Sequence, residues 1–138
     1  MGSESTAAAA SKESWLLPFT ATSVRNARTH ITVALRRHGI AQHVVDDARI
    51  VVSELLGNAL RHARPIRDGG LLLSLDVEAD SVRLEVSDGG SATLPTLLHP
   101  PALALSGRGL TIVRTLTREW GVHETAEGNT VFGVLALT

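Results

Sequence analysis

Two stretches in which apolar and polar residues alternate constrain the fold of this chain more than any other feature. Gly69–Glu78 carries leucine or valine at every second position, and Val82–Ser87 repeats the same period. A period of two is typical of a β-strand that buries one face. Because only Ala79–Ser81 separates the two stretches, we predict that they form an antiparallel hairpin.

The segments on either side of this hairpin predict three helices and three further strands. Apolar periodicity and terminal residues predict the helices, which are Thr22–His38, Gln42–Ala63 and Gly109–Glu119. The further strands are expected at Trp15–Phe19, Trp120–His123 and Thr130–Leu137, with a turn at Glu127–Asn129 before the last of them. For the first helix, Thr20 or Thr22 is the candidate N-cap and Gly39 is the expected stop.

This order of elements mixes helices with antiparallel strands and therefore predicts an α+β fold. We expect a two-layer α/β sandwich, in which three helices cover one face of a mixed, mostly antiparallel sheet. Residues 1–14 are rich in Ser and Ala and predict a disordered tail, which leaves 15–138 as a single domain. Ser91–Ser106 holds three prolines and neither Lys nor Arg, so we expect a long irregular loop there.

Composition and charge argue against several classes of function. The 138 residues carry a net charge of -1 and no cysteine. Nothing therefore favours direct nucleic-acid binding, a disulfide framework or a Cys-ligated zinc. The apolar runs are far shorter than a membrane span, and no signal-peptide core precedes the domain. We expect a cytoplasmic protein without a membrane partner.

A polar stripe along the second predicted helix contains the first candidate site residues. With an advance of about 100° per residue, Asp47, Glu54, Asn58 and Arg61 fall within an arc of roughly 60°. In one interpretation, the stripe is the solvent-facing side of an amphipathic helix. In the other, Asn58 offers an oxygen ligand to Mg²⁺, and Glu54 accepts a proton from an attacking hydroxyl or water. The helix alone leaves both interpretations open.

Two glycine-containing loops supply further candidates. Asp88 continues the buried face of its strand, so its carboxylate needs a hydrogen-bond donor such as the exocyclic amine of adenine. Gly89 and Gly90 allow the backbone to turn sharply there, although a plain Asp-Gly turn is the alternative. The run Gly107–Leu110 opens a helix whose free N–H groups can cradle phosphate, with a flexible hinge as the alternative. It matches neither a Walker A loop nor a Rossmann fingerprint.

Taken in order, these motifs resemble the GHKL ATPase superfamily, which has the Bergerat ATP-binding fold. Val52–Ala63 resembles its N box, while Asp88–Gly90 and Ser106–Leu110 resemble the next two boxes. Gly128–Thr130 stands where a closing Gly-x-Thr element is expected. The small size and the wording Ser-Glu-Leu-x-x-Asn-Ala-x-Arg-His-Ala are most similar to bacterial anti-sigma-factor serine-protein kinases, which have a histidine-kinase-like ATPase domain.

The resemblance implies a role for each candidate residue. Asn58 would coordinate Mg²⁺, and Glu54 would activate the acceptor hydroxyl. Asp88 would bind the adenine amine beside Gly90, with Thr130 assisting through its hydroxyl. Ser91–Ser106 would be the ATP lid. The residues expected to wrap the phosphates are Gly107, Arg108, Gly109 and Leu110.

The resemblance also implies an activity and partners. Its members are ATP- and Mg-dependent serine/threonine-protein kinases that phosphorylate a serine of a small STAS-type anti-anti-sigma protein and sequester a sigma factor, generally as homodimers. Here Asn129 stands where many relatives carry Lys, and the lid has no positive residue. The alternative is therefore an ATP-binding regulatory module without kinase turnover, which controls a partner through its lid. A detached histidine-kinase catalytic domain is disfavoured, because the chain has no room for a phosphoacceptor helix pair.

Overall fold

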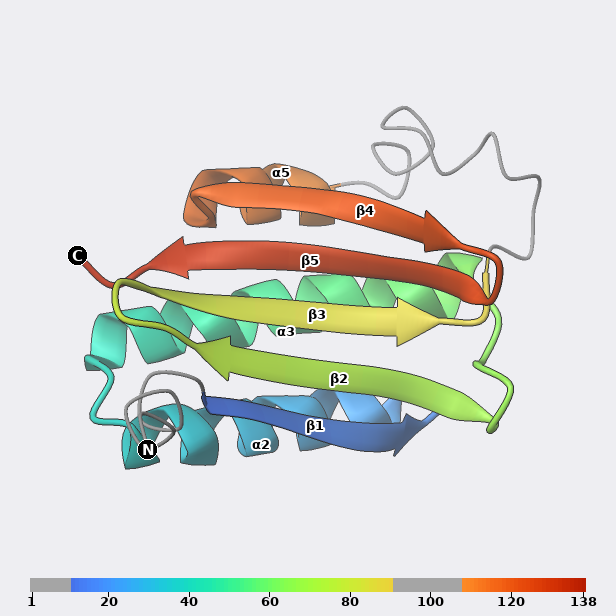
Figure 1. The fold of residues 1–138 in the computed structure, drawn as a ribbon, viewed down its shortest axis with the longest axis horizontal. Coiled ribbons are helices and arrows are strands. Elements are labelled where there is room, and N and C mark those ends of the chain that lie inside the picture. Colours follow the sequence, from blue (N-terminus) through green and yellow to red (C-terminus); the bar gives the residue numbers. More distant parts are fainter. Residues whose placement is uncertain (1–10, 91–107) are drawn as a thin grey trace, which may run out of the picture.

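The computed structural model describes residues 11–90 and 108–138, so the start of the expected tail and the expected lid at Ser91–Ser106 lie outside the described residues. The described chain forms five strands and three helices (Figure 1). The strands are β1 (Ser11–Pro18), β2 (Gly70–Val77), β3 (Ser81–Asp88), β4 (Glu119–Thr125) and β5 (Gly128–Ala136). The helices are α2 (Thr22–Arg37), α3 (Gln42–His62) and α5 (Arg108–Leu116).

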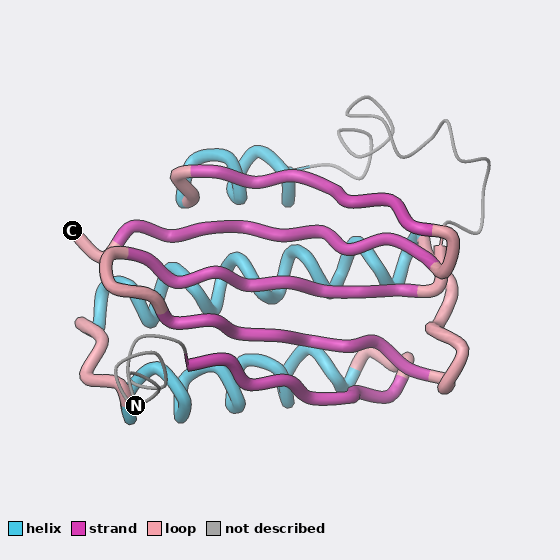
Figure 2. The backbone as a smooth tube through the Cα atoms, viewed as in Figure 1, coloured by secondary structure: helices cyan, strands magenta, loops and turns pink. Residues whose placement is uncertain are grey.

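The strands form one sheet in the order β1-β2-β3-β5-β4, and every pairing between the described strands is antiparallel. Figure 2 shows them side by side. The predicted hairpin is confirmed, because β2 and β3 pair in a register that sets Leu75 opposite Leu84. Both side chains are at most 1% exposed. Alternate positions on the two strands thus supply the buried face of the sheet.

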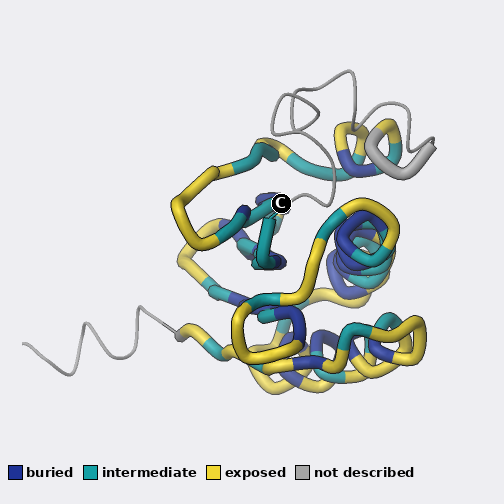
Figure 3. Tube along the Cα trace, turned by 90° about the vertical axis from the view of Figure 1, so that its right-hand side faces the viewer, coloured by how far each residue is buried: buried dark blue, intermediate teal, exposed yellow. Residues whose placement is uncertain are grey.

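The three helices cover one face of the sheet, which confirms the predicted two-layer α+β sandwich (Figure 3). Helix α3 lies along the centre, where it contacts β3, β5 and both other helices. Its apolar side includes four residues that are at most 1% exposed, namely Val51, Val52, Leu55 and Leu56. Burial of this apolar surface is the main force that holds the two layers together. Within the described part of the chain, no helix is long and apolar enough to cross a membrane.

Strand β1 begins at Ser11 instead of the predicted Trp15. The pairing register explains the difference, since Ser11 lies opposite Val77 at the far end of β2 and the ladder runs along both strands. Residues 11–14, which we expected in the disordered tail, therefore belong to the sheet. This moves the boundary of the predicted tail toward the N-terminus.

The first helix starts without the expected threonine cap. Its N-cap residue is Ala21, which makes no side-chain capping bond, so the prediction of Thr20 or Thr22 is wrong. A backbone bond stands in for the cap, because the N–H of Ser23 donates to the carbonyl oxygen of Thr20 at 3.0 Å. The predicted stop is confirmed, since Gly39 follows α2 with a φ of 71°.

The last two strands are longer than predicted, and only Ala126 and Glu127 separate them. Helix α5 correspondingly ends at Leu116, because Glu119 already begins β4. The longer β5 places Asn129 inside a strand and not in a turn. The side chain of Asn129 therefore points to one defined face of the sheet.

Truncation of a core leucine in the sheet should destabilise the protein strongly. We expect Leu84→Ala to lower the free energy of unfolding by about 2–5 kcal/mol, because the side chain is fully buried and leaves a cavity. Urea denaturation followed by circular dichroism measures this loss. The matched control is Leu16→Ala, whose side chain is 56% exposed on β1 and should change stability by less than about 1 kcal/mol. Equal losses for the two variants would contradict the assignment of the core.

Candidate functional site

Helix α3 carries two of the predicted site residues one turn apart. Asn58 is only 5% exposed, and its Oδ1 accepts a hydrogen bond from Nη2 of Arg61 at 3.1 Å. Glu54 is half-buried, whereas Arg61 is exposed. A purely solvent-facing stripe would leave Asn58 in water. The burial of Asn58 therefore disfavours the interpretation in which the whole polar stripe faces solvent.

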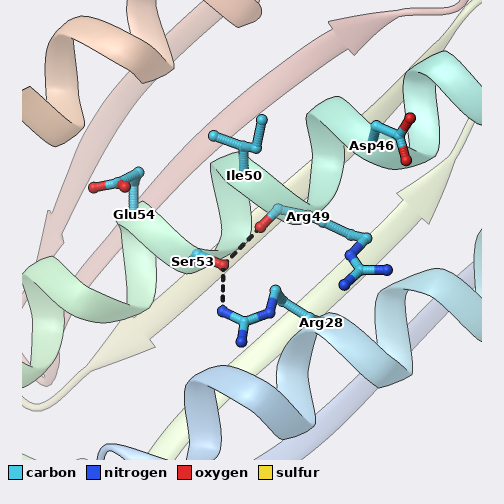
Figure 4. Close-up of a pocket in the computed structure, with 6 residues that line it drawn as sticks. All are labelled: Arg28, Asp46, Arg49, Ile50, Ser53 and Glu54. Carbon is cyan, nitrogen blue, oxygen red and sulfur yellow. Dashed lines mark hydrogen bonds between the residues drawn. The ribbon is translucent and has the colours of Figure 1, made fainter.

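Glu54 borders a hollow of about 340 Å³ between α2 and α3, which Figure 4 shows in close-up. Arg28 reaches the same hollow from α2, where its Nη1 donates to Oγ of Ser53 at 3.1 Å. Ser53 Oγ in turn donates to the carbonyl oxygen of Arg49 at 2.7 Å. Glu54 therefore shares this hollow with the side chains of Arg28 and Ser53.

Asp88 ends β3 with its carboxylate turned into the molecule, where the residue is 6% exposed. Its Oδ1 accepts a hydrogen bond from the backbone N–H of Gly90 at 2.7 Å. Burial raises the pKa of Asp88 above the usual 3.8, and hydrogen bonds from Gly90 and Asn129 act in the opposite direction. A carboxylate held this way is a strong acceptor for one further donor.

Two backbone hydrogen bonds hold the end of β3 against the segment that follows α3. The N–H of Gly89 donates to the carbonyl oxygen of Arg64, and the N–H of Arg64 donates to the carbonyl oxygen of Gly90, both at 2.8 Å. The two chains come so close that a Cβ at Gly89 would clash with the carbonyl oxygen of Pro65. Glycine is therefore required at this position for steric reasons, and the approach brings Asp88 to the C-terminal end of α3.

The structure separates Thr130 from Asp88. In the β3–β5 ladder, Asp88 lies opposite Asn129 and Ser87 lies opposite Thr130. Because successive residues of a strand point to opposite faces, Asn129 shares the face of Asp88, and its side chain hydrogen-bonds the carboxylate. Thr130 Oγ1 lies instead 2.8 Å from Oγ of Ser87.

Asn129 is therefore a candidate site residue that the sequence did not predict. In the sequence, the Gly-x-Thr element pointed to Thr130, and Asn129 was seen only as a residue that differs from the Lys of many relatives. The alternation of strand residues places Asn129 on the face of Asp88, but only once the β3–β5 register is known.

A larger cavity of about 910 Å³ lies at this end of the sheet. It is bordered by Asp88 and Thr130, by the β4–β5 turn, and by the segment from Pro65 to Asp68. Its described lining does not include Glu54 or Asn58, which lie on α3. The described residues thus bring Asp88 and Asn129 into contact, while Thr130 borders the same cavity from the opposite face of the sheet. They place Glu54 at a separate hollow.

The predicted phosphate-binding run falls at the start of α5. This helix begins at Arg108, so Arg108, Gly109 and Leu110 form its first turn, while Gly107 lies outside the described residues. Helix α5 packs against α3, and its Val113 is fully buried. In the described part of the chain, no group of three His, Cys, Asp or Glu side chains is placed to hold a metal ion.

Comparison with known proteins decides the family. The sequence model of the histidine kinase-like ATPase domain matches residues 17–132. The chain belongs to this family. The matched range includes Glu54, Asn58, Asp88 and Thr130, and the predicted GHKL resemblance is confirmed.

A solved structure agrees with this assignment. The RsbU and RsbW domains of Rv1364c from Mycobacterium tuberculosis match 91% of this chain with a TM-score of 0.69 and 20% sequence identity. The chain spans only 33% of that longer protein, and the likeness shows a common fold. A comparison with curated protein sequences finds no match.

The close approach at Gly89 gives a stability prediction for this histidine kinase-like ATPase domain. We expect Gly89→Ala to lower the free energy of unfolding by about 1–3 kcal/mol, because the added Cβ forces Pro65 and Arg64 away from β3. Gly57→Ala is the matched control. Its Cβ meets only the end of the Arg61 side chain at 3.4 Å, so it should stabilise α3 by up to about 1 kcal/mol. Thermal unfolding measures the stability of both variants. An unchanged stability of Gly89→Ala would show that Gly89 and Pro65 do not lie as close together as described.

Proposed function

We propose that this chain is an ATP- and Mg-dependent serine-protein kinase that acts as an anti-sigma regulator. It phosphorylates a serine of a STAS-type anti-anti-sigma protein and sequesters a sigma factor, working as a cytoplasmic homodimer. The observation that carries the proposal is the buried carboxylate of Asp88, which the Arg64 backbone bonds hold beside the end of α3 in a histidine kinase-like ATPase domain. The match to an RsbW domain supports the same assignment at the level of the fold.

The adenine end of the site is assigned to Asp88. Its buried carboxylate accepts a hydrogen bond from the exocyclic amine of ATP, and the side chain of Asn129 keeps the carboxylate oriented. Gly90, with a φ of 107°, turns the chain away and leaves the ring free to approach. Thr130, next to Asn129 in β5, assists adenine binding through its hydroxyl, which also contacts the hydroxyl of Ser87.

The phosphate end is assigned to α3 and α5. Asn58 fits as a ligand for Mg²⁺ because α3 holds its side-chain amide in a nearly buried position, where it offers an oxygen. The metal ion supplies neutralising charge to the phosphates of ATP. Arg108 and the backbone N–H groups at the start of α5, with Gly107, Gly109 and Leu110, bind the phosphate oxygens. Ser91–Ser106, which lies outside the described residues, is assigned the role of the ATP lid.

Glu54 is assigned the proton transfer. Its carboxylate accepts the proton of the acceptor serine while the serine oxygen forms a bond to the γ-phosphorus of ATP. The bond between that phosphorus and the β,γ-bridging oxygen breaks, and ADP leaves. The hollow beside Glu54 gives the serine a path to the carboxylate.

The second candidate is an ATP-binding regulatory module without kinase turnover. One observation favours it: Arg61 donates to the same Asn58 oxygen that would hold Mg²⁺. Incubation with γ-labelled ATP and the purified STAS proteins of the source organism separates the two candidates. Transfer of label to a STAS serine supports the kinase, whereas tight ATP binding without transfer supports the module.

Removal of the Asp88 carboxylate should weaken ATP binding. We expect Asp88→Ala to raise the Kd for ATP at least about tenfold, because a hydrogen bond to a charged group is lost. Asp80→Ala removes an exposed carboxylate at the far end of the hairpin and serves as the charge-matched control. Calorimetry measures both affinities.

The raised pKa of Asp88 adds a pH dependence. As the pH falls through that raised pKa, the carboxylate gains a proton and no longer accepts from the amine. As the pH is lowered, the affinity of the wild type for ATP should therefore begin to fall above pH 3.8, where an unperturbed Asp is still ionised. The affinity of Asp88→Ala should not show this fall. Parallel pH profiles for the two proteins would contradict the role of Asp88.

Loss of the Glu54 carboxylate should separate binding from catalysis. We expect Glu54→Ala to bind ATP with a Kd within about twofold of wild type and to lose about 10²–10⁴-fold in the rate of phosphoryl transfer. Single-turnover transfer of label to the STAS protein measures the rate. Glu124→Ala, an exposed change on β4, is the control. Undiminished transfer by Glu54→Ala would exclude this residue as the general base.

A further inference from the structure

The outer side of α2 and α3 carries a groove of which the proposed chemistry uses only one end. Two adjoining hollows, of about 340 and 140 Å³, share Arg28 and Arg49 in their walls. The larger hollow extends to Glu54, and the smaller one extends to Thr32 and Val33. We call the two together the α2–α3 groove; Figure 4 shows its larger half.

The middle of the α2–α3 groove is basic. Arg28 and Arg49 are both half-buried, and among residues 11–90 and 108–138 neither has a carboxylate within ion-pair distance. Asp46 also borders the larger hollow, but its Oδ1 accepts a hydrogen bond from Nε2 of Gln42 at 2.8 Å. Helix α2 brings no opposing charge to the groove, because it carries no acidic residue.

Two exposed apolar side chains border the groove. Val33 is 53% exposed and Ile50 is 42% exposed, which makes them two of the three exposed large hydrophobic residues found in the described chain. Apolar side chains beside two arginines fit a polypeptide surface better than water.

We propose that the α2–α3 groove is the docking site for the acceptor protein and that it binds an acidic, amphipathic segment beside the acceptor serine. Carboxylates of the segment pair with Arg28 and Arg49, and its apolar side chains cover Val33 and Ile50. The proposal rests on the kinase function proposed above, because Glu54 is the group toward which the segment is directed.

Charge complementarity also sets the direction in which the segment lies. Glu54 follows Arg49 by about 7.5 Å along α3, given a rise of about 1.5 Å per residue. An acidic side chain is attracted to the arginines and repelled by Glu54. A segment whose carboxylates sit on Arg28 and Arg49 therefore presents a neutral hydroxyl, a few residues away, to Glu54.

The test uses the full chain and the STAS protein that the wild type retains in the presence of ATP, chosen from the purified STAS proteins of the source organism. Among the described residues the Arg49 side chain makes no hydrogen bond or ion pair, so Arg49→Ala breaks none. Val33→Asp places a negative charge in an exposed position. We expect each to raise the Kd for the STAS protein at least about tenfold. The Kd for ATP should stay within about twofold of wild type, which reports that the site remains folded.

Two matched controls share the chemistry of these changes but lie elsewhere. Arg118→Ala removes an exposed arginine beside β4, and Leu16→Asp adds a charge at an exposed position of β1. Both should bind the STAS protein as the wild type does. Added salt should weaken wild-type binding more than it weakens binding by Arg49→Ala, since the ion pair is screened.

Each other outcome overturns the docking assignment in a recognisable way. If Arg49→Ala and Val33→Asp bind the STAS protein as tightly as the controls do, the groove is not the docking site, although the kinase function stands. If they dissociate a homodimer, or lose only sigma-factor binding, the occupant is a second copy or the sigma factor. If the wild type neither binds nor phosphorylates any STAS protein, the proposed function fails first, and the docking assignment fails with it.

Discussion

Two backbone hydrogen bonds between Arg64 and the glycines after Asp88 are the contact on which the rest of this molecule depends. They join the end of the central helix to the end of a central strand, and they require a glycine because Pro65 leaves no room for a Cβ. The helix brings Glu54 and Asn58, and the strand brings Asp88. The apolar core holds the two layers together, and this contact fixes the end of α3 against the end of β3.

Burial then gives these groups their chemical character. Asp88 and Asn58 are both nearly excluded from solvent, and each has a specific partner, Asn129 in one case and Arg61 in the other. Buried polar groups are costly unless they are satisfied, so their arrangement is tightly determined. The raised pKa of Asp88 reflects the same burial. A buried acceptor held at the edge of a domain is suited to recognise a single donor on a flat ring.

Local patterns predicted the central part of the fold well. The hairpin of β2 and β3 follows from alternation, and the limits of α3 follow from apolar periodicity and Pro65. The start of β1 could not be predicted, because Ser11 to Ser14 join the sheet through pairing with β2 and carry no apolar alternation of their own. The same limit applies to Asn129, whose face depends on the β3–β5 register. The α2–α3 groove could not be predicted from the sequence, because the convergence of Arg28 and Arg49 depends on the packing of two helices.

The central claim is that Asp88 forms an adenine-specific ATP site, and one titration tests it most directly. The Kd of the full chain for ATP is compared with its Kd for purine riboside triphosphate, which lacks only the exocyclic amine, in the presence of Mg²⁺. The account predicts that ATP binds at least about tenfold more tightly, since only ATP donates to the buried carboxylate. Equal affinity for the two nucleotides would contradict it.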